Sequence, residues 1–376
     1  MKKRSSNRFR LAAMLLIFFA CAFLLPASRT GDARLYLLAA AVPAAMLILL
    51  FLPGGTMFLD RPSLSVGLIL CGFSILAPAA TMPDEALSQG MRCVAALLFL
   101  MAGTVLVRAF SPSFPAAVLV ALCGLGMLSV PQWLPSLDFS LAEGGTALLL
   151  FSVVAFLAIR QCIPALLAAL GGLLFLLLQQ EAGTAAIWCV TSVLVFWAAS
   201  GSALWSGISL VSIGGLFAGF HFLPTQLLPD ADAAVSSFPR LAALPLLAPE
   251  TVPVSTSSPD SLFLLLGEQY GLIFLLCALL LVLLLLLRGA SLALHTRKSF
   301  HASVALGAVL LIGFRALLFM LWLIGLSPVQ TVDFPLLTSS LPSLCAGFFL
   351  LGLLSGISAR NEADLEEDSR LAMLAH

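Results

Sequence analysis

The chain has 376 residues, a length that would suit two or three soluble domains. Its composition excludes them: 61% of the residues are apolar, only 10% are charged and the mean hydropathy is +1.11, whereas soluble proteins carry about 25% charged residues. The formal net charge of zero argues against nucleic-acid binding. The composition therefore predicts an all-α polytopic membrane protein, a bundle of transmembrane helices.

Twelve apolar segments approach the roughly 20 residues that a membrane-spanning helix needs. In chain order they are 11–26, 35–53, 63–80, 91–110, 115–131, 145–160, 163–179, 184–199, 202–222, 262–287, 302–326 and 338–358. The longest polar interval between them is 223–261, and an acidic tail follows at 359–376. The first segment follows a basic stretch, as in a signal peptide, but we expect an uncleaved first helix.

The distribution of basic residues predicts the orientation of these twelve segments. With the N-terminus inside, 13 of the 18 Lys and Arg residues fall on the inner side, and Arg315 lies within a span. The four on the outer side are Arg29, Arg34, Arg92 and Arg240. Because basic residues concentrate in cytoplasmic loops, both termini are expected in the cytoplasm and 223–261 on the outer face.

Charged residues within or beside the spans are the candidate functional groups, because a charge in the membrane is costly. They are Glu143, Glu181 in a polar break, Glu268 and Arg315. Two interpretations stay open for them: internal pairing that fixes helix packing, or a polar cavity that opens outward. Asp260 precedes an apolar segment at the membrane boundary, where an aspartate can also simply cap a helix.

Other motifs are few. The eight cysteines include no C-x-x-C pair and no metal-ligand spacing, so the sequence predicts no metal site. Gly215-x-x-x-Gly219 and Gly352-x-x-x-Gly356 match the pattern that allows two membrane helices to approach closely. No phosphate-binding loop or hydrolase motif is present.

Four stretches between Trp133 and Asn361 resemble, in order, the motifs of the SEDS family (shape, elongation, division and sporulation proteins such as FtsW, RodA and SpoVE). The family's R-W-I with Q-P-S-E-x-x-K, Q-P-D-L-G-T-A, H-T-D-F-I-F-A-V-L-G-E-E-L-G, and G-L-x-P-V with P-F-x-S-Y-G-G-S-S are the motifs concerned. Their counterparts here are 132–134 with 140–146, 179–185, 258–271, and 325–329 with 335–343.

The resemblance implies a SEDS-like core of about ten spans at 63–358, preceded by a two-span extension at 1–62 and followed by the cytoplasmic tail at 359–376. It implies a bacterial plasma-membrane protein that polymerises lipid II, an undecaprenyl-linked disaccharide-peptide, at the outer membrane face. The implied protein partner is a class B penicillin-binding protein. The implied process is cell division, elongation or sporulation, and the surrounding membrane lipid is a further contact.

Asp260 matches the aspartate that the family uses for catalysis, and a carboxylate there can act as general base toward a sugar hydroxyl. The expected substrate-binding residues are Glu143, Glu181, Glu268, Arg240 and Arg315. The pyrophosphate leaving group needs positive charge, from arginine or from a divalent cation such as Mg²⁺ or Mn²⁺.

The chain also departs from the family pattern. The lysine of E-x-x-K is Thr146 here, and the family's glycine-rich stretch in the outer loop is missing. We therefore predict that Glu143 pairs across the bundle, with Arg315 the basic candidate in the span interiors. Two alternatives to the polymerase remain open. One is a non-catalytic SEDS-like scaffold that recruits a penicillin-binding protein, and the other is an unrelated transporter or lipid-linked-sugar ligase.

Overall fold

The computed structural model describes residues 2–51, 60–133, 141–222, 244, 246, 262–326 and 332–374. Within these residues the fold is entirely helical, with thirteen helices and no strand. They are α1 (Lys2–Thr30), α2 (Ala33–Phe51), α4 (Arg61–Leu76), α5 (Pro83–Ala109), α6 (Phe114–Trp133), α7 (Ala142–Ala158), α8 (Cys162–Leu178), α9 (Ala182–Ser200), α10 (Ala203–Phe222), α13 (Leu262–Tyr270), α14 (Leu272–His295), α15 (Ser299–Leu323) and α16 (Leu341–Leu374). The predicted helical bundle is confirmed.

Seven helices in the described part of the chain are long and apolar enough to cross a membrane. Five further apolar helices have shorter described stretches of 10–17 residues. Each of the twelve predicted segments overlaps one of these helices, so local hydropathy located the helices. The chain is a multi-pass membrane protein, and its many exposed Leu, Ile, Val and Phe side chains are those that lipid would cover.

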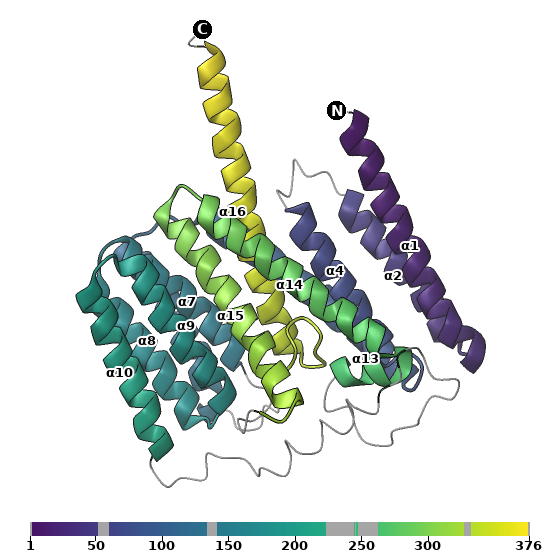
Figure 1. Cartoon of the computed structure of the whole chain (residues 1–376), viewed down its shortest axis with the longest axis horizontal. Coiled ribbons are helices and arrows are strands. Elements are labelled where there is room, and N and C mark those ends of the chain that lie inside the picture. Colours follow the sequence, from purple (N-terminus) through teal and green to yellow (C-terminus); the bar gives the residue numbers. More distant parts are fainter. Residues whose placement is uncertain are drawn as a thin grey trace.

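Both termini lie at the same end of the bundle (Figure 1). The helices from α7 to α10 form one side of the molecule and the hairpin of α1 and α2 the other, with α16 between them (Figure 1). The start of α16 and the short α13 lie at the end opposite the termini (Figure 1). We call this the distal end; it is the end for which the distribution of basic residues predicts the outer side of the membrane.

Helices α5 and α16 pack closely, and glycines bring their backbones together. A Cβ on Gly103 would collide with the carbonyl oxygen of Phe349, and one on Gly352 with that of Leu100. The hydroxyl of Thr104 donates to the Gly352 carbonyl at 3.1 Å. The Gly352 motif thus packs two helices as its pattern predicts. At Gly215 and Gly219 of α10 an added Cβ would meet no described atom within 4 Å, so that motif makes no such contact here.

One predicted segment was wrong. The segment 262–287 is not one helix, because Gly271 (φ 92°, ψ 169°) separates α13 from α14 in a conformation that only glycine adopts readily. The last predicted span, 338–358, overlaps the apolar part of α16, and this helix continues to Leu374 and projects beyond the bundle (Figure 1). A helix that extends into water needs no apolar residues, so hydropathy indicates where the span ends but not where the helix ends.

Aromatic side chains attach the N-terminal hairpin to the rest of the bundle. Phe19 of α1 lies 5.9 Å from Phe73 of α4 between ring centroids. Phe73 in turn lies 5.8 Å from Phe274 of α14, and Phe18 stacks on Phe274 at 6.1 Å. Such ring pairs are worth about 0.5–1.5 kcal/mol each beyond their buried area. The hairpin is therefore an integral part of the packed structure.

The orientation of the bundle is testable by chemical labelling. Ser236 falls in the interval 223–261, which lies outside the described residues and for which the basic-residue distribution predicts the outer face. We expect Ser236→Cys to react with a membrane-impermeant maleimide in intact cells. A cysteine introduced at Ser299, at the start of α15 on the opposite side, should react only after the cells are opened. The reverse pattern would invert the topology.

Candidate functional site

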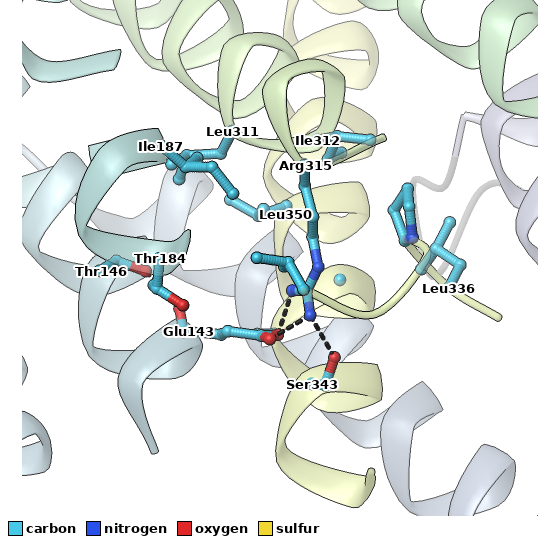
Figure 2. Close-up of a pocket in the computed structure, with 14 residues that line it drawn as sticks. Glu143, Thr146, Thr184, Ile187, Leu311, Ile312, Arg315, Leu336, Ser343 and Leu350 are labelled. Atoms are coloured by element: carbon cyan, nitrogen blue, oxygen red, sulfur yellow. Dashed lines mark hydrogen bonds and ion pairs between the residues drawn. The ribbon is translucent and has the colours of Figure 1, made fainter. Parts of the chain in front are cut away.

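A cavity lies near the distal end, between α7, α9, α15 and α16, close to the start of α16 (Figure 2). Its volume is about 40 Å³. One part of its wall is polar and the remainder is apolar. The lining residues are Glu143, Thr146, Thr184, Ile187, Leu311, Ile312, Arg315, Val332, Pro335, Leu336, Ser343, Ala346, Gly347 and Leu350.

The polar wall is built around an ion pair between Glu143 and Arg315. Both terminal nitrogens of Arg315 donate to the two carboxylate oxygens of Glu143, a bidentate arrangement (Figure 2). The side chains are only 11% (Arg315) and 19% (Glu143) exposed. The pairing predicted from the sequence is confirmed. A bidentate pair of this kind fixes both side chains and is among the stronger polar contacts in proteins.

Arg315 also contacts two other parts of the site. It donates to the hydroxyl of Ser343 on α16 at 2.6 Å and, through Nε, to the backbone carbonyl of Asp333 at 2.9 Å. The guanidinium group thereby joins α7, α15, α16 and the segment before α16. Since its donors are shared among these acceptors, Arg315 is largely neutralised and held in place.

Thr146 stands one turn after Glu143 and lines the same cavity. Its hydroxyl donates to the backbone carbonyl of Glu143 at 2.9 Å and so leaves the carboxylate to Arg315. In the SEDS motif E-x-x-K, the lysine that corresponds to Thr146 supplies a positive charge on the same helix as the glutamate. Here the positive charge beside Glu143 comes from Arg315 on α15. The ion pair is interhelical, which makes it a constraint on how α7 and α15 pack.

Two of the other predicted site residues, Glu181 and Glu268, are described, and both lie outside this cavity. Glu181 is at the turn between α8 and α9, and Glu268 is on α13; both are partly buried, and neither lines the cavity. Asp260 and Arg240 lie outside the described residues. The structure thus brings together Glu143 and Arg315, and it adds Ser343 and the Asp333 carbonyl. The sequence could have indicated Ser343, because it matches the last serine of the family motif. It could not have indicated the Asp333 carbonyl, because every residue has a backbone carbonyl.

The described residues do not form a cation site. No three His, Cys, Asp or Glu side chains in this part of the chain come close enough to hold a metal ion. Both oxygens of Glu143 are occupied by Arg315, and one oxygen of Asp333 accepts from the Thr338 hydroxyl. An ion that binds near the cavity would have to bring most of its ligands with its substrate.

Comparison with known proteins found a matching family model and a solved structure of similar fold. The FTSW_RODA_SPOVE family model, described as a cell cycle protein, matches residues 250–363, which include α13 to α15 and most of α16. No curated protein matches the chain by sequence. A solved structure described as "Structural coordination of polymerization and crosslinking by a peptidoglycan synthase complex" contains a chain with the same fold. The TM-score is 0.59 at 20% identity, over 81% of this chain and 98% of that one.

Residues 250–363 of the chain are thus similar to the FtsW/RodA/SpoVE family, the SEDS proteins. The matched residues contain two of the four motif stretches that carry the resemblance, 258–271 and 325–343. They also contain Arg315 and Ser343, two of the polar side chains that line the cavity.

Proposed function

We propose that the chain serves peptidoglycan synthesis as a glycosyltransferase that polymerises lipid II at the outer face of the bacterial plasma membrane. The observation that carries the proposal is the ion-paired polar cavity at the distal end. Arg315 and Ser343, which line this cavity, fall within the residues that match the family model, and Asp260 falls within the same residues. A polar cavity near the membrane surface suits a substrate whose lipid tail stays in the bilayer while its sugars remain in water.

The proposed reaction joins two lipid-linked sugars. The 4-hydroxyl of the acceptor's GlcNAc attacks C1 of the donor's MurNAc, and the bond from C1 to the undecaprenyl pyrophosphate breaks. Asp260 accepts the hydroxyl proton as general base, because an alcohol is a weak nucleophile at neutral pH. The pyrophosphate carries the negative charge away. Asp260 comes two residues before Leu262, the first residue of α13, in the sequence.

Positive charge near the departing pyrophosphate would lower the barrier. Arg240 is the outer-loop candidate; Arg315 lines the cavity but is already paired with Glu143. The expected Mg²⁺ or Mn²⁺ ion would be bound chiefly by pyrophosphate oxygens, since the described residues gather no cation site. Glu181 and Glu268 complete the set of proposed substrate-binding residues.

A class B penicillin-binding protein is the proposed partner, by analogy with the peptidoglycan synthase complex that shares the fold. The decisive experiment incubates the purified chain with lipid II, with and without a candidate partner and with and without EDTA, and resolves the products on a gel. Glycan polymer that requires the chain supports the proposal. Binding of the partner without any polymer would favour the scaffold alternative. The absence of both polymer and partner binding would favour an unrelated transporter or ligase.

A further inference from the structure

The segment 332–340, which precedes α16, forms one wall of the cavity. We call it the strap. Val332, Pro335 and Leu336 of the strap line the cavity, and Phe334 and Leu337 beside them are at most 1% exposed. The strap therefore packs as part of the core, although it has no regular secondary structure. Its backbone must be held by contacts with other elements.

The strap has a conformation that would not persist alone. Leu336 has φ of 65°, a left-handed conformation that disfavours a residue with a Cβ. Its side chain nevertheless packs tightly against α16, because a Cβ on Gly347 would lie 2.8 Å from the Leu336 Cδ2 atom. A strained residue of this kind remains only where surrounding contacts determine it.

Two side chains of α5 supply contacts on the side away from Arg315. Gln89, only 1% exposed, donates from Nε2 to the Thr338 carbonyl at 2.8 Å. Arg92 donates to the Ser339 carbonyl at 3.0 Å and to Gln89 Oε1 at 3.2 Å. The second bond fixes the Gln89 amide with its NH₂ group toward the strap. Neither residue lines the cavity.

The strap is also closed on itself and fixed at its other end. Thr338 donates its hydroxyl to Asp333 and accepts from the Ser340 backbone N–H at 3.0 Å. Arg315 holds the Asp333 carbonyl from the cavity side. Since glycines lock α5 directly onto α16, the helix that holds the strap cannot move independently of the helix that the strap leads into.

We propose that Gln89 and Arg92 are positioning residues: α5 holds the strap through them, so that Leu336 forms the wall of the substrate cavity opposite Glu143. They act through the strap and do not touch substrate. The inference rests on the proposed function only for the identity of the substrate. The mechanical part, that α5 determines the position of the strap, stands independently of it.

The test uses the full chain with Leu337→Cys as a reporter in the strap. Labelling by a water-soluble maleimide is quantified at position 337 by mass spectrometry, so the eight native cysteines do not interfere. Because Leu337 is buried, labelling should be slow. Gln89→Leu, which keeps the size of the side chain but removes the donor, should accelerate it at least tenfold. Arg92→Met should accelerate it about threefold, and Arg92→Lys should restore the slow rate.

Asp84→Asn is the matched control. Asp84 is in the first turn of the same helix and pairs with Arg34 of α2, not with the strap. The Leu337→Cys reporter should be labelled at the same rate with Asp84→Asn as without it. If Gln89→Leu folds poorly, Arg92→Met carries the test, because the Arg92 side chain is 32% exposed. Rates within twofold of the reporter in both variants would overturn the inference.

Polymerisation separates the inference from the proposed function. In a chain without the reporter, Gln89→Leu should raise the KM for lipid II about fivefold and change kcat less, because the cavity wall is displaced and the general base is not. Faster labelling together with no polymer from the wild-type chain would refute the polymerase while leaving the strap inference intact. Unchanged labelling in a chain that makes polymer would refute the strap inference alone.

Discussion

Replacing Asp260 by asparagine is expected to abolish polymerisation of lipid II while leaving the protein folded. General-base catalysis contributes about 10²–10⁴ in rate, and an amide cannot accept the proton usefully. The polymer yield of Asp260→Asn in the gel assay should fall by at least a hundredfold. Expression and thermal stability should be near those of the wild-type chain.

The same substitution separates catalysis from helix capping. Asparagine caps a helix about as well as aspartate does, so a residue that only capped the helix beginning at Leu262 would tolerate the change. Asp260→Glu gives a second comparison, because it keeps the carboxylate but moves it by one methylene. It should retain more activity than the amide. Full polymer formation by Asp260→Asn would eliminate the base assignment.

Removing Arg315 is expected to have the largest effect on stability. Arg315→Gln leaves the Glu143 carboxylate without its bidentate partner at a site where it is only 19% exposed. Breaking a buried ion pair from one side costs about 3–5 kcal/mol, and we expect ~3 kcal/mol here because the pair is partly hydrated. The melting temperature, measured in detergent by loss of the monodisperse protein, should fall by about 5 °C.

A charge supplied from another position should repair this loss. Thr146 is one turn from Glu143 on α7 and lines the same cavity, so a lysine there can reach the carboxylate. Thr146→Lys should restore most of the stability of Arg315→Gln, whereas in the wild-type background it adds an unneeded charge and should destabilise. Glu143→Gln combined with Arg315→Gln should cost less than the two single changes added together.

The exposed pair of Arg34 and Asp84 is the control for this series, since its side chains are 50% and 82% exposed. Arg34→Gln should change stability by less than about 1 kcal/mol, as is usual for surface ion pairs. If Arg315→Gln were equally mild, the ion pair at the cavity would contribute no more than a surface contact. The constraint that it places on α7 and α15 would then have to come from apolar packing alone.

The sequence by itself determined the architecture, because the physics of membrane insertion is local. Each apolar segment must satisfy its own backbone hydrogen bonds as a helix, so hydropathy located all twelve. The partnership of Glu143 and Arg315, 172 residues apart, was also predictable. A buried carboxylate needs a cation, and Arg315 was the only Lys or Arg residue away from the ends of the predicted spans.

Only the tertiary structure decided how the cavity is enclosed. The break at Gly271 and the left-handed Leu336 leave no mark in hydropathy, because hydropathy carries no information on backbone torsion angles. The bonds from Gln89 and Arg92 go to backbone carbonyls, which every residue possesses and no motif records. Side-chain chemistry can be read along a chain, but which backbone groups a donor meets depends on which helices pack together, and here that is set by the glycine contact between α5 and α16.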